Sequence, residues 1–390
     1  MQTSCIRLFS LLVLVLFCIH GCSTKPLFVK LSPSQYPVFA DDVAYKDIQQ
    51  AVERSVAYLN TLPASTSYHI GELECSVADL ITTHERFLHD LNGVNDVGQL
   101  GVIITNHFDV FQARGVSGCN PEKNMLVTSY YQPVFEGSLS QTKQYQYPLY
   151  KVPQDLVVQQ QNKKRIVRRL VDGQLVSYWS RRDIEEGKHL AGQELVWLKS
   201  PVDAFFLHVQ GSGIIELPDG TTRAVRYGGK NGLEYKSIGK YMVEQGMITL
   251  EEASLETIRA YLESHPQEQD TILHHNPSYI FFEWGSTENA VGSMGQALTP
   301  GRSVAADKEV FPLGALAFLR TRIPAANSDE VQWQPMDRFV TVQDTGSAIQ
   351  GPGRVDLFWG TGAAAGRAAG MMKEQGTLYI LLKKAEDGHE

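Results

Sequence analysis

The chain has 390 residues, which is enough for two domains with sizeable hydrophobic cores. Hydrophobic residues at 43% and charged residues at 20% are usual for a folded globular protein, and 33 Gly with 17 Pro indicate many turns. The net charge of -8 argues against a dedicated nucleic-acid binder, because such a protein needs excess positive charge to neutralise phosphates.

The N-terminus has the pattern of an export signal. One Arg precedes an apolar run over residues 8–19, which is short for a membrane span. The run ends at Ile19-His20-Gly21-Cys22-Ser23, which resembles the cleavage box of bacterial lipoproteins. We therefore expect residues 1–21 to be removed as a signal peptide and Cys22 to be acylated; cleavage that leaves Cys22 free is the alternative. No other segment is apolar enough to span a membrane.

Removal of the signal and acylation of Cys22 would leave Cys75 and Cys119 as the remaining pair of cysteines. An even pair in an oxidising compartment is consistent with a disulfide, and two separately buried thiols fit equally well. Neither cysteine is accompanied by a His-containing constellation, so neither is predicted to be catalytic.

The N-terminal part of the mature chain predicts a tether followed by helices. Residues 22–42 are punctuated by Pro and are expected to link the anchor to the fold. Apolar residues at helical spacing then predict two packing helices, one from residue 48 to before Pro63 and one over residues 77–91.

After residue 124 the pattern predicts mostly strands. The predicted elements up to residue 265 are strands at 125–131, 146–152, 165–171, 194–198 and 204–209, a helix at 237–245, and a helix capped by Thr249 and Glu252 that ends near residue 264. The later ones are strands at 279–282, 316–320, 339–343, 355–358 and 378–382, and a helix at 362–372. No repeat of fixed period is present, which excludes solenoids and propellers.

Three aspartates stand out in the C-terminal third. Asp307 precedes Phe311-Pro312-Leu313-Gly314, Asp344 begins Asp344-Thr345-Gly346, and Asp356 lies within Arg354-Val355-Asp356-Leu357-Phe358. This triple resembles the 3D domain, a double-psi β-barrel module of cell-wall enzymes.

The resemblance extends over nearly the whole mature chain to the membrane-bound lytic transglycosylase A family. The motifs that carry it include Ser129-Tyr130-Tyr131-Gln132-Pro133, Gln210-Gly211-Ser212-Gly213, Tyr227-Gly228-Gly229-Lys230-Asn231-Gly232, Asn276-Pro277-Ser278-Tyr279 and Leu298-Thr299-Pro300-Gly301-Arg302-Ser303. It implies a mainly β fold with some helices. Residues 43–133 plus 284–390 would form the catalytic double-psi β-barrel domain, residues 134–283 an inserted β-rich substrate-binding domain, and the substrate would lie in a groove between them.

The resemblance also implies an activity: cleavage of the MurNAc–GlcNAc β-1,4 bond of peptidoglycan, with formation of 1,6-anhydro-MurNAc ends. Asp356 matches the family's single acid/base, and Asp344 matches a second aspartate near the site. One carboxyl group suffices because it can protonate the leaving oxygen and then accept the proton of the sugar's own 6-hydroxyl. A turn-capping role is the structural alternative for Asp356. For Asp344, a catalytic role and a loop-ordering role stay open.

The candidate substrate-binding residues lie in the matched motifs and around the first aspartate. They are Ser129, Tyr130, Tyr131, Gln132, Gln210, Gly211, Ser212, Lys230, Asn231 and Asp307. The two tyrosines offer rings on which a sugar can stack, and strand alternation predicts that one faces the groove and the other the core. The Gly-rich polar loops suit hydrogen bonding to sugar hydroxyls, although plain turns have the same composition.

Two other functions fit parts of the sequence. Asp344-Thr345-Gly346-Ser347 resembles the active-site loop of aspartic proteases, but these need two such aspartates and the chain has one copy. A non-catalytic, peptidoglycan-binding lipoprotein would keep the fold without the activity. The histidines lack metal-ligand spacing and the Gly-rich loops lack nucleotide-binding patterns, so we expect no metal and no cofactor. The expected partners are glycan strands, the membrane through the lipid, and candidate cell-wall enzymes, at the periplasmic face of the outer membrane.

Overall fold

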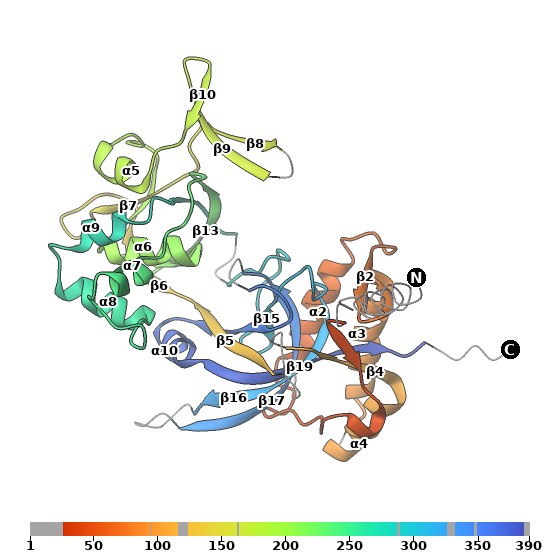
Figure 1. Cartoon of the computed structure of the whole chain (residues 1–390). Coiled ribbons are helices and arrows are strands. Elements are labelled where there is room, and N and C mark those ends of the chain that lie inside the picture. The colour runs from red at the N-terminus through yellow and green to blue at the C-terminus, as the bar shows by residue number, and fades with distance from the viewer. Residues whose placement is uncertain are drawn as a thin grey trace, which may run out of the picture.

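The computed structural model describes residues 26–94, 96–115, 124–161, 164–286, 289–325, 332–346 and 349–385. The predicted signal peptide, Cys22 and Cys119 lie outside these residues. Figure 1 shows two β-rich bodies, each with helices packed at its periphery. The expectation of a mainly β fold with some helices is therefore confirmed.

The first body is a closed barrel. Its strands follow one another in the order β19-β16-β17-β15-β18-β5, and β5 pairs back with β19, so the ring has no free edge. The barrel strands are β5 (Met125–Gln132), β15 (Ser303–Ala305), β16 (Leu316–Pro324), β17 (Trp333–Asp344), β18 (Arg354–Thr361) and β19 (Lys373–Lys383). Two further strands, β4 (Phe108–Ala113) and β1 (Phe28–Lys30), extend the sheet outward from β19.

Alternating apolar residues fill the barrel, and helices cover its outside. Val304, Val340 and Val355 are fully buried in one continuous hydrophobic core with residues of the other barrel strands. The barrel's helices and its small hairpin are α2 (Ile48–Leu59), α3 (Val77–Leu91), α4 (Val97–His107), α10 (Ala363–Met371), β2 (Ser67–Ile70) and β3 (Leu73–Ser76). The two predicted packing helices are confirmed as α2 and α3.

The segment before α2 is folded onto the barrel, so the predicted tether is wrong for residues 26–42. Its first residues form β1, and the rings of Phe28 and Phe39 are buried. Asp41 makes a two-pronged ion pair with Arg302, and both side chains are almost completely buried. The frequent prolines suggested an extended linker, but apolar and charged partners on the barrel hold the segment in place.

The second body is built around a six-stranded sheet in the order β14-β13-β12-β6-β11-β7. Its sheet strands are β6 (Val134–Ser138), β7 (Tyr147–Tyr150), β11 (Glu194–Leu198), β12 (Ser212–Glu216), β13 (Thr222–Lys230) and β14 (Ile280–Trp284). The helices are α5 (Arg181–Gly187), α6 (Pro201–Gln210), α7 (Ile238–Glu244), α8 (Leu255–Ser264) and α9 (Gln269–His274). A separate three-stranded sheet of β8 (Leu156–Gln161), β9 (Lys164–Val171) and β10 (Gln174–Ser177) stands out from this body (Figure 1).

In the second body one predicted element is wrong, and another, the helix that ends at Ser264 as predicted, has the wrong start. Residues 204–209 form part of the helix α6 rather than a strand, because Ser200 caps the helix and Pro201 occupies its first turn. The run looks like a buried strand because this helix is buried on nearly all sides. Thr249 and Glu252 do form their reciprocal hydrogen bonds, but these close a turn; α8 begins later, after the cap at Ser254.

Cys75 is a buried thiol that forms no disulfide within the described part of the chain. Burial raises its pKa to about 11, which keeps it protonated and unreactive near neutral pH. Among the described residues no helix combines the length and the apolar character needed to cross a bilayer.

Candidate active site

The strand register brings the second and third predicted aspartates onto neighbouring strands. Asp344 on β17 and Asp356 on β18 both pair with Ala305 on β15, which lies between them. On the far side of β18, Asp356 pairs with Thr128 of β5. The register of β15 with β17 shifts just before Ala305, but the contact of Asp344 with Tyr130, two residues after Thr128 on β5, places both aspartates on the same side. Strand spacing puts their Cα atoms roughly 10 Å apart. Thr128 and Asp356, which are more than two hundred residues apart in the sequence, are thus paired on adjacent strands.

Asp356 is held by two side chains. The hydroxyl of Thr128 donates a hydrogen bond to its Oδ1, and Arg354 Nε lies 3.1 Å from the same oxygen. Arg354 Nη2 lies 3.3 Å from Oδ2, so the guanidinium reaches both carboxylate oxygens. The Asp356 side chain keeps 16% of its surface exposed. The carboxyl group is therefore oriented by the protein and still accessible.

Asp344 is bound differently. Its Oδ1 accepts the backbone N–H groups of Ser293 and Thr345, each at 2.8 Å, and its Oδ2 accepts the hydroxyl of Tyr130 at 2.9 Å. Burial raises the pKa of Asp344, and these three hydrogen bonds partly oppose the shift because they favour the ionised form. Both oxygens are already engaged, as expected for a group that orders the loop around it.

Tyr130 contacts both Asp344 and the strand that carries Asp356. Its ring packs against Phe358 of β18 with 5.3 Å between centroids, and its hydroxyl reaches Asp344. Burial raises its pKa well above the usual value, and the negative charges of Asp344 and then Asp356 raise it further. The hydroxyl thus remains a proton donor in hydrogen bonds across the neutral range. Tyr131 lies against α10 instead, where a Cβ added to Gly366 would come within 2.7 Å of its ring.

The other predicted residues near the barrel have structural partners. Asp307 accepts the backbone N–H of Glu309 at 3.0 Å and that of Gly351 at 2.7 Å, so it orders the loop before β18. Ser129 donates to the carbonyl of Ala369 at 3.2 Å. Gln132 is 4% exposed and accepts the hydroxyl of Thr361 at 3.0 Å. These contacts fix the loop and β5 beside α10 and β18.

The predicted residues of the second body separate into two groups. The end of α6 and the start of β12 carry Gln210, Gly211 and Ser212. This turn lies next to the junction of β5 and β6, since the N–H of Ile214 on β12 bonds to the carbonyl of Pro133 at 2.8 Å. Lys230 is exposed at the end of β13.

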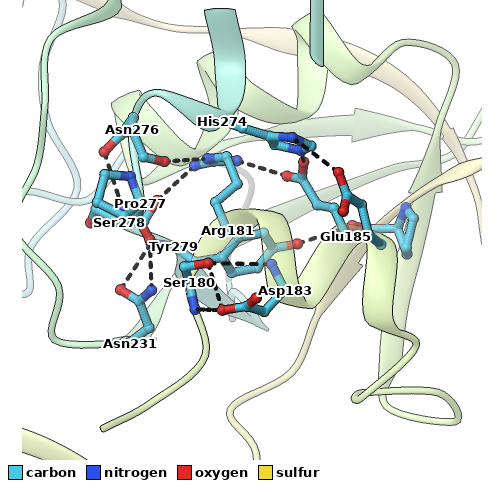
Figure 2. Close-up of polar contacts among 12 residues, drawn as sticks. Ser180, Arg181, Asp183, Glu185, Asn231, His274, Asn276, Pro277, Ser278 and Tyr279 are labelled. Carbon is cyan, nitrogen blue, oxygen red and sulfur yellow. Dashed lines mark hydrogen bonds and ion pairs between the residues drawn. The ribbon is translucent and has the colours of Figure 1, made fainter. Parts of the chain in front are cut away.

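Asn231 is fully buried, which corrects its assignment to substrate binding. Its amide nitrogen donates to the carbonyl of Trp179. The same nitrogen donates to the carbonyl of Pro277, and the side-chain oxygen accepts the N–H of Tyr279 at 3.0 Å (Figure 2). With every polar atom used inside the protein, the side chain anchors a loop. The Gly-rich polar sequence around it did not distinguish this role from ligand binding.

Figure 2 also shows how Arg181 completes this anchor. The guanidinium is 1% exposed, donates to the carbonyls of Asn276 and Ser278, and pairs with Glu185 at 2.9 Å. Arg181 and Asn231 together donate to four backbone carbonyls, those of Asn276, Ser278, Trp179 and Pro277, so these buried groups have the partners that burial requires. The region is a rigid support within the second body.

Sequence reasoning missed Thr128 and Arg354, which hold Asp356, and Gln343, which holds the end of β17 next to Asp344. Gln343 is 1% exposed, and its amide nitrogen donates to Ala51 O at 2.7 Å and Ser55 Oγ at 2.9 Å of α2. Its oxygen accepts the hydroxyl of Ser303 on β15. Arg354 lies two residues before Asp356 on the same strand, so strand alternation alone could have placed both on one face. The other two depend on register and packing that the sequence does not reveal.

Known proteins match both bodies of this chain. The family described as "MltA specific insert domain" matches residues 126–283, and the "3D domain" matches residues 302–382. The membrane-bound lytic murein transglycosylase A of Escherichia coli (strain K12) is 31% identical over 269 residues, which are 68% of each chain.

Solved structures agree with these matches. A membrane-bound lytic murein transglycosylase from Agrobacterium tumefaciens is 29% identical, with a TM-score of 0.72 over 91% of this chain and 97% of that one. MltA from Neisseria gonorrhoeae is 27% identical, with a TM-score of 0.73 over 94% of this chain and 95% of that one. The chain belongs to the membrane-bound lytic murein transglycosylase A family.

Proposed function

We propose that this chain is a peptidoglycan lytic transglycosylase in which Asp356 acts first as the acid and then as the base. Family membership supports the activity. The observation that carries the assignment to Asp356 is the difference between the two aspartates. The carboxyl group of Asp356 is oriented by the side chains of Thr128 and Arg354 and keeps 16% of its side chain exposed, whereas Asp344 accepts two backbone N–H groups and the hydroxyl of Tyr130.

The reaction needs one carboxyl group and no water. Protonated Asp356 donates its proton to the glycosidic oxygen as the bond between this oxygen and C1 of MurNAc breaks, which releases the 4-hydroxyl of GlcNAc. Positive charge develops at C1, as in other glycosidic cleavages. The 6-hydroxyl of the same MurNAc then bonds to C1, and its proton passes to the Asp356 carboxylate. The products are a 1,6-anhydro-MurNAc end and a regenerated acid.

Thr128 and Arg354 act as positioning residues in this proposal. Both contact Oδ1 of Asp356, and Arg354 also reaches Oδ2, so the carboxyl group is directed before substrate arrives. Tyr130 and Asp344 form the adjoining wall. The strands that supply these residues come from distant parts of the chain, which gives the site a rigid frame.

The domain organisation and location belong to the same proposal. The closed ring of six strands supports the double-psi description of the barrel, with residues 26–133 and 284–390 forming this domain once the folded N-terminal segment is included, residues 134–283 the insert, and the glycan between them. Ser129, Tyr130, Tyr131, Gln210, Gly211, Ser212 and Lys230 remain our candidates for glycan contacts. We further propose acylation at Cys22 and a place at the periplasmic face of the outer membrane, consistent with membrane-bound relatives in Gram-negative bacteria.

The test is digestion of purified peptidoglycan by residues 23–390 and mass spectrometry of the released fragments. Fragments lighter by one water than hydrolytic products are expected from the wild type. Asp356→Asn should abolish them, while Asp337→Asn, a matched change elsewhere on the barrel, should not. Ordinary reducing ends would contradict the single-carboxylate mechanism.

The rival functions predict other outcomes. A non-catalytic peptidoglycan-binding protein would bind glycan and release nothing. An aspartic protease requires two carboxyl groups that share a proton. Among the described residues, Asp344 instead bonds to backbone N–H groups and a tyrosine, which disfavours that reading.

A further inference from the structure

The sheet formed by β8, β9 and β10 carries a local positive charge in an acidic protein. Five of the seven residues from 163 to 169 are Lys or Arg, although the chain as a whole has a net charge of -8. The sheet stands out from the second body (Figure 1). A concentration of one charge sign on a projecting element is typical of a surface that meets a charged partner.

One face of this sheet is fixed against the second body. Val167 is 5% exposed and lies against Gly232, where an added Cβ would come within 2.6 Å of it. The guanidinium of Arg169 stacks on the ring of Trp179 at 3.7 Å, and Trp179 stacks in turn on His189 at 3.9 Å. These contacts hold the sheet in one orientation.

The opposite face presents a cation beside apolar side chains. Arg168 alternates with Val167 and Arg169, so it projects to the other side. It pairs in register with Ser177, and Leu170 pairs with Leu175 one step along the same face. The two leucines are 50% and 39% exposed. Within the described part of the chain, Arg168 has no acidic partner.

We propose that this face binds the peptide stems of peptidoglycan, an inference that rests on the proposed function. Stem peptides combine free carboxylate groups with the methyl groups of alanine, and they branch from the MurNAc units of the strand that the enzyme would cut. Arg168 suits the carboxylates because its guanidinium presents several donors in a plane. Leu170 and Leu175 suit the methyl groups. The sheet thus selects glycan that carries peptides over bare glycan.

The test measures binding without turnover. In an Asp356→Asn background, the affinity for a peptide-bearing disaccharide is compared with that for the same disaccharide without peptide. We expect tighter binding of the peptide-bearing form and a loss of about tenfold in Arg168→Glu, confined to that form, because hydrogen bonds to charged groups have about this value. A Leu170→Ser, Leu175→Ser double variant should also weaken it. Lys240→Glu makes the same charge change at a 77% exposed position on α7 and should alter neither affinity.

Each outcome separates this inference from the proposed function. Equal affinity for both disaccharides, or an unchanged affinity in Arg168→Glu, overturns the inference even if the wild type cuts glycan. If the protein binds the peptide-bearing disaccharide selectively but the wild type releases no anhydro ends, the proposed activity is refuted and the peptide site is still supported. Arg168-dependent binding to vesicles with phosphatidylglycerol, without selectivity for the peptide, assigns the face to lipid and also overturns the inference.

Discussion

The two neighbouring aspartates of the barrel, Asp344 and Asp356, have different hydrogen-bond partners. Asp344, at the end of β17, accepts two backbone N–H groups of the adjoining loops and the hydroxyl of Tyr130 on β5, whereas Asp356 faces the hydroxyl of Thr128 and the guanidinium of Arg354 on strand surfaces. Backbone donors are fixed by the loop's own conformation, so an acceptor there stabilises that conformation. Strand side chains can rearrange around a ligand without loss of fold. The two carboxyl groups are therefore suited to different tasks.

This difference predicts unequal effects of the two conservative substitutions. Asp356→Asn should lower kcat by about 10³-fold, the range usual for loss of a general acid. Asp344→Asn should lower it by about tenfold or less, because the Asn oxygen can still accept the two N–H groups. Rates of anhydro-end formation by both variants provide the measurement. A larger loss in Asp344→Asn, with unchanged thermal stability, would show that Asp344 takes a direct part in catalysis.

Two buried histidines make stability depend on pH. His84 bonds to the carbonyl of Gly314 at 2.6 Å, and burial lowers its pKa to about 4. His208 lies 4.2 Å from the ring of Tyr279, and neither of its nitrogens has a partner among the described residues. Burial, and then the charge of Arg181, lower its pKa well below the usual value. The unfolded chain therefore binds more protons than the folded chain below about pH 6.5, and stability falls as the pH decreases.

Replacing His208 by Phe should remove part of this dependence. The variant loses no hydrogen bond seen in the described residues and keeps an aromatic ring beside Tyr279 and Phe282. We expect a higher Tm than wild type at pH 5, and a smaller difference at pH 8, where the histidine is neutral in both states. Circular dichroism melts across this range test it, with the exposed His89→Gln as control. An advantage equal at both pH values would show that packing, and not protonation, is responsible.

At the scale of elements, local patterns succeeded where one face of an element is buried and the other is wet. The helix at 77–91 is of this kind and has the predicted bounds. The strand at 194–198 also has its predicted bounds, although it has buried residues on both faces, because it is a short apolar run of strand length. Residues 204–209 failed because α6 is buried on most sides, which removes the periodicity that separates a helix from a strand. The small hairpin of β2 and β3 was not predicted either; its residues 67, 69, 73 and 74 are exposed, so it carries little apolar pattern.

For the candidate site, the sequence identified the two aspartates as candidates but not the residues that surround them. The local contexts of Asp344 and Asp356 identified both as site residues by resemblance. Their neighbours depend on pairings between strands far apart in the chain, such as Asp356 with Thr128. Local sequence does not determine such register, because closing loops of this length depends on the whole core. Asn231 shows the converse: a polar residue in a Gly-rich loop can be an internal anchor.

The docking of the small sheet on the second body depends on one glycine. Gly232 has a φ of +79°, and an added Cβ would lie 2.6 Å from Val167; Gly246 has a φ of +70° with open space around it. Both Gly→Ala changes incur the left-handed strain of about 1–2 kcal/mol. Gly232→Ala should lose about 1–3 kcal/mol more through overpacking, and it should raise proteolysis within residues 156–177. Urea melts of the two variants measure the difference. Equal losses would mean that the sheet is not held at this contact.

The N-terminal segment ties together distant parts of the barrel body. Asp41 and Asp42 pair with Arg302 and Arg338, which lie next to or within β15 and β17, and Arg302 also donates to the carbonyls of Lys46 and Phe339. Ala44, Tyr45 and Asp47 all have positive φ values, a costly conformation for residues other than Gly. The ion pairs and the buried Phe39 offset this cost. The segment thereby reaches the strands that carry Ala305 and Asp344.

This arrangement predicts that the fold requires the residues before α2. A chain that starts at residue 26 should match the stability of one that starts at residue 23, whereas a chain that starts at residue 43 should be strongly destabilised or fail to fold. Shortening to residue 43 removes β1 and the buried rings of Phe28 and Phe39, and it leaves Arg302 charged and unpaired in a buried position. Loss of one partner of a buried ion pair alone costs about 3–5 kcal/mol. Asp41→Asn in the chain from residue 23 measures the contribution of the ion pair alone. Guanidinium melts compare the stability of this variant with that of the chains from residues 23, 26 and 43. If the chain from residue 43 melted like the others, the N-terminal segment would be a passive linker after all, and the barrel would hold its aspartates without it.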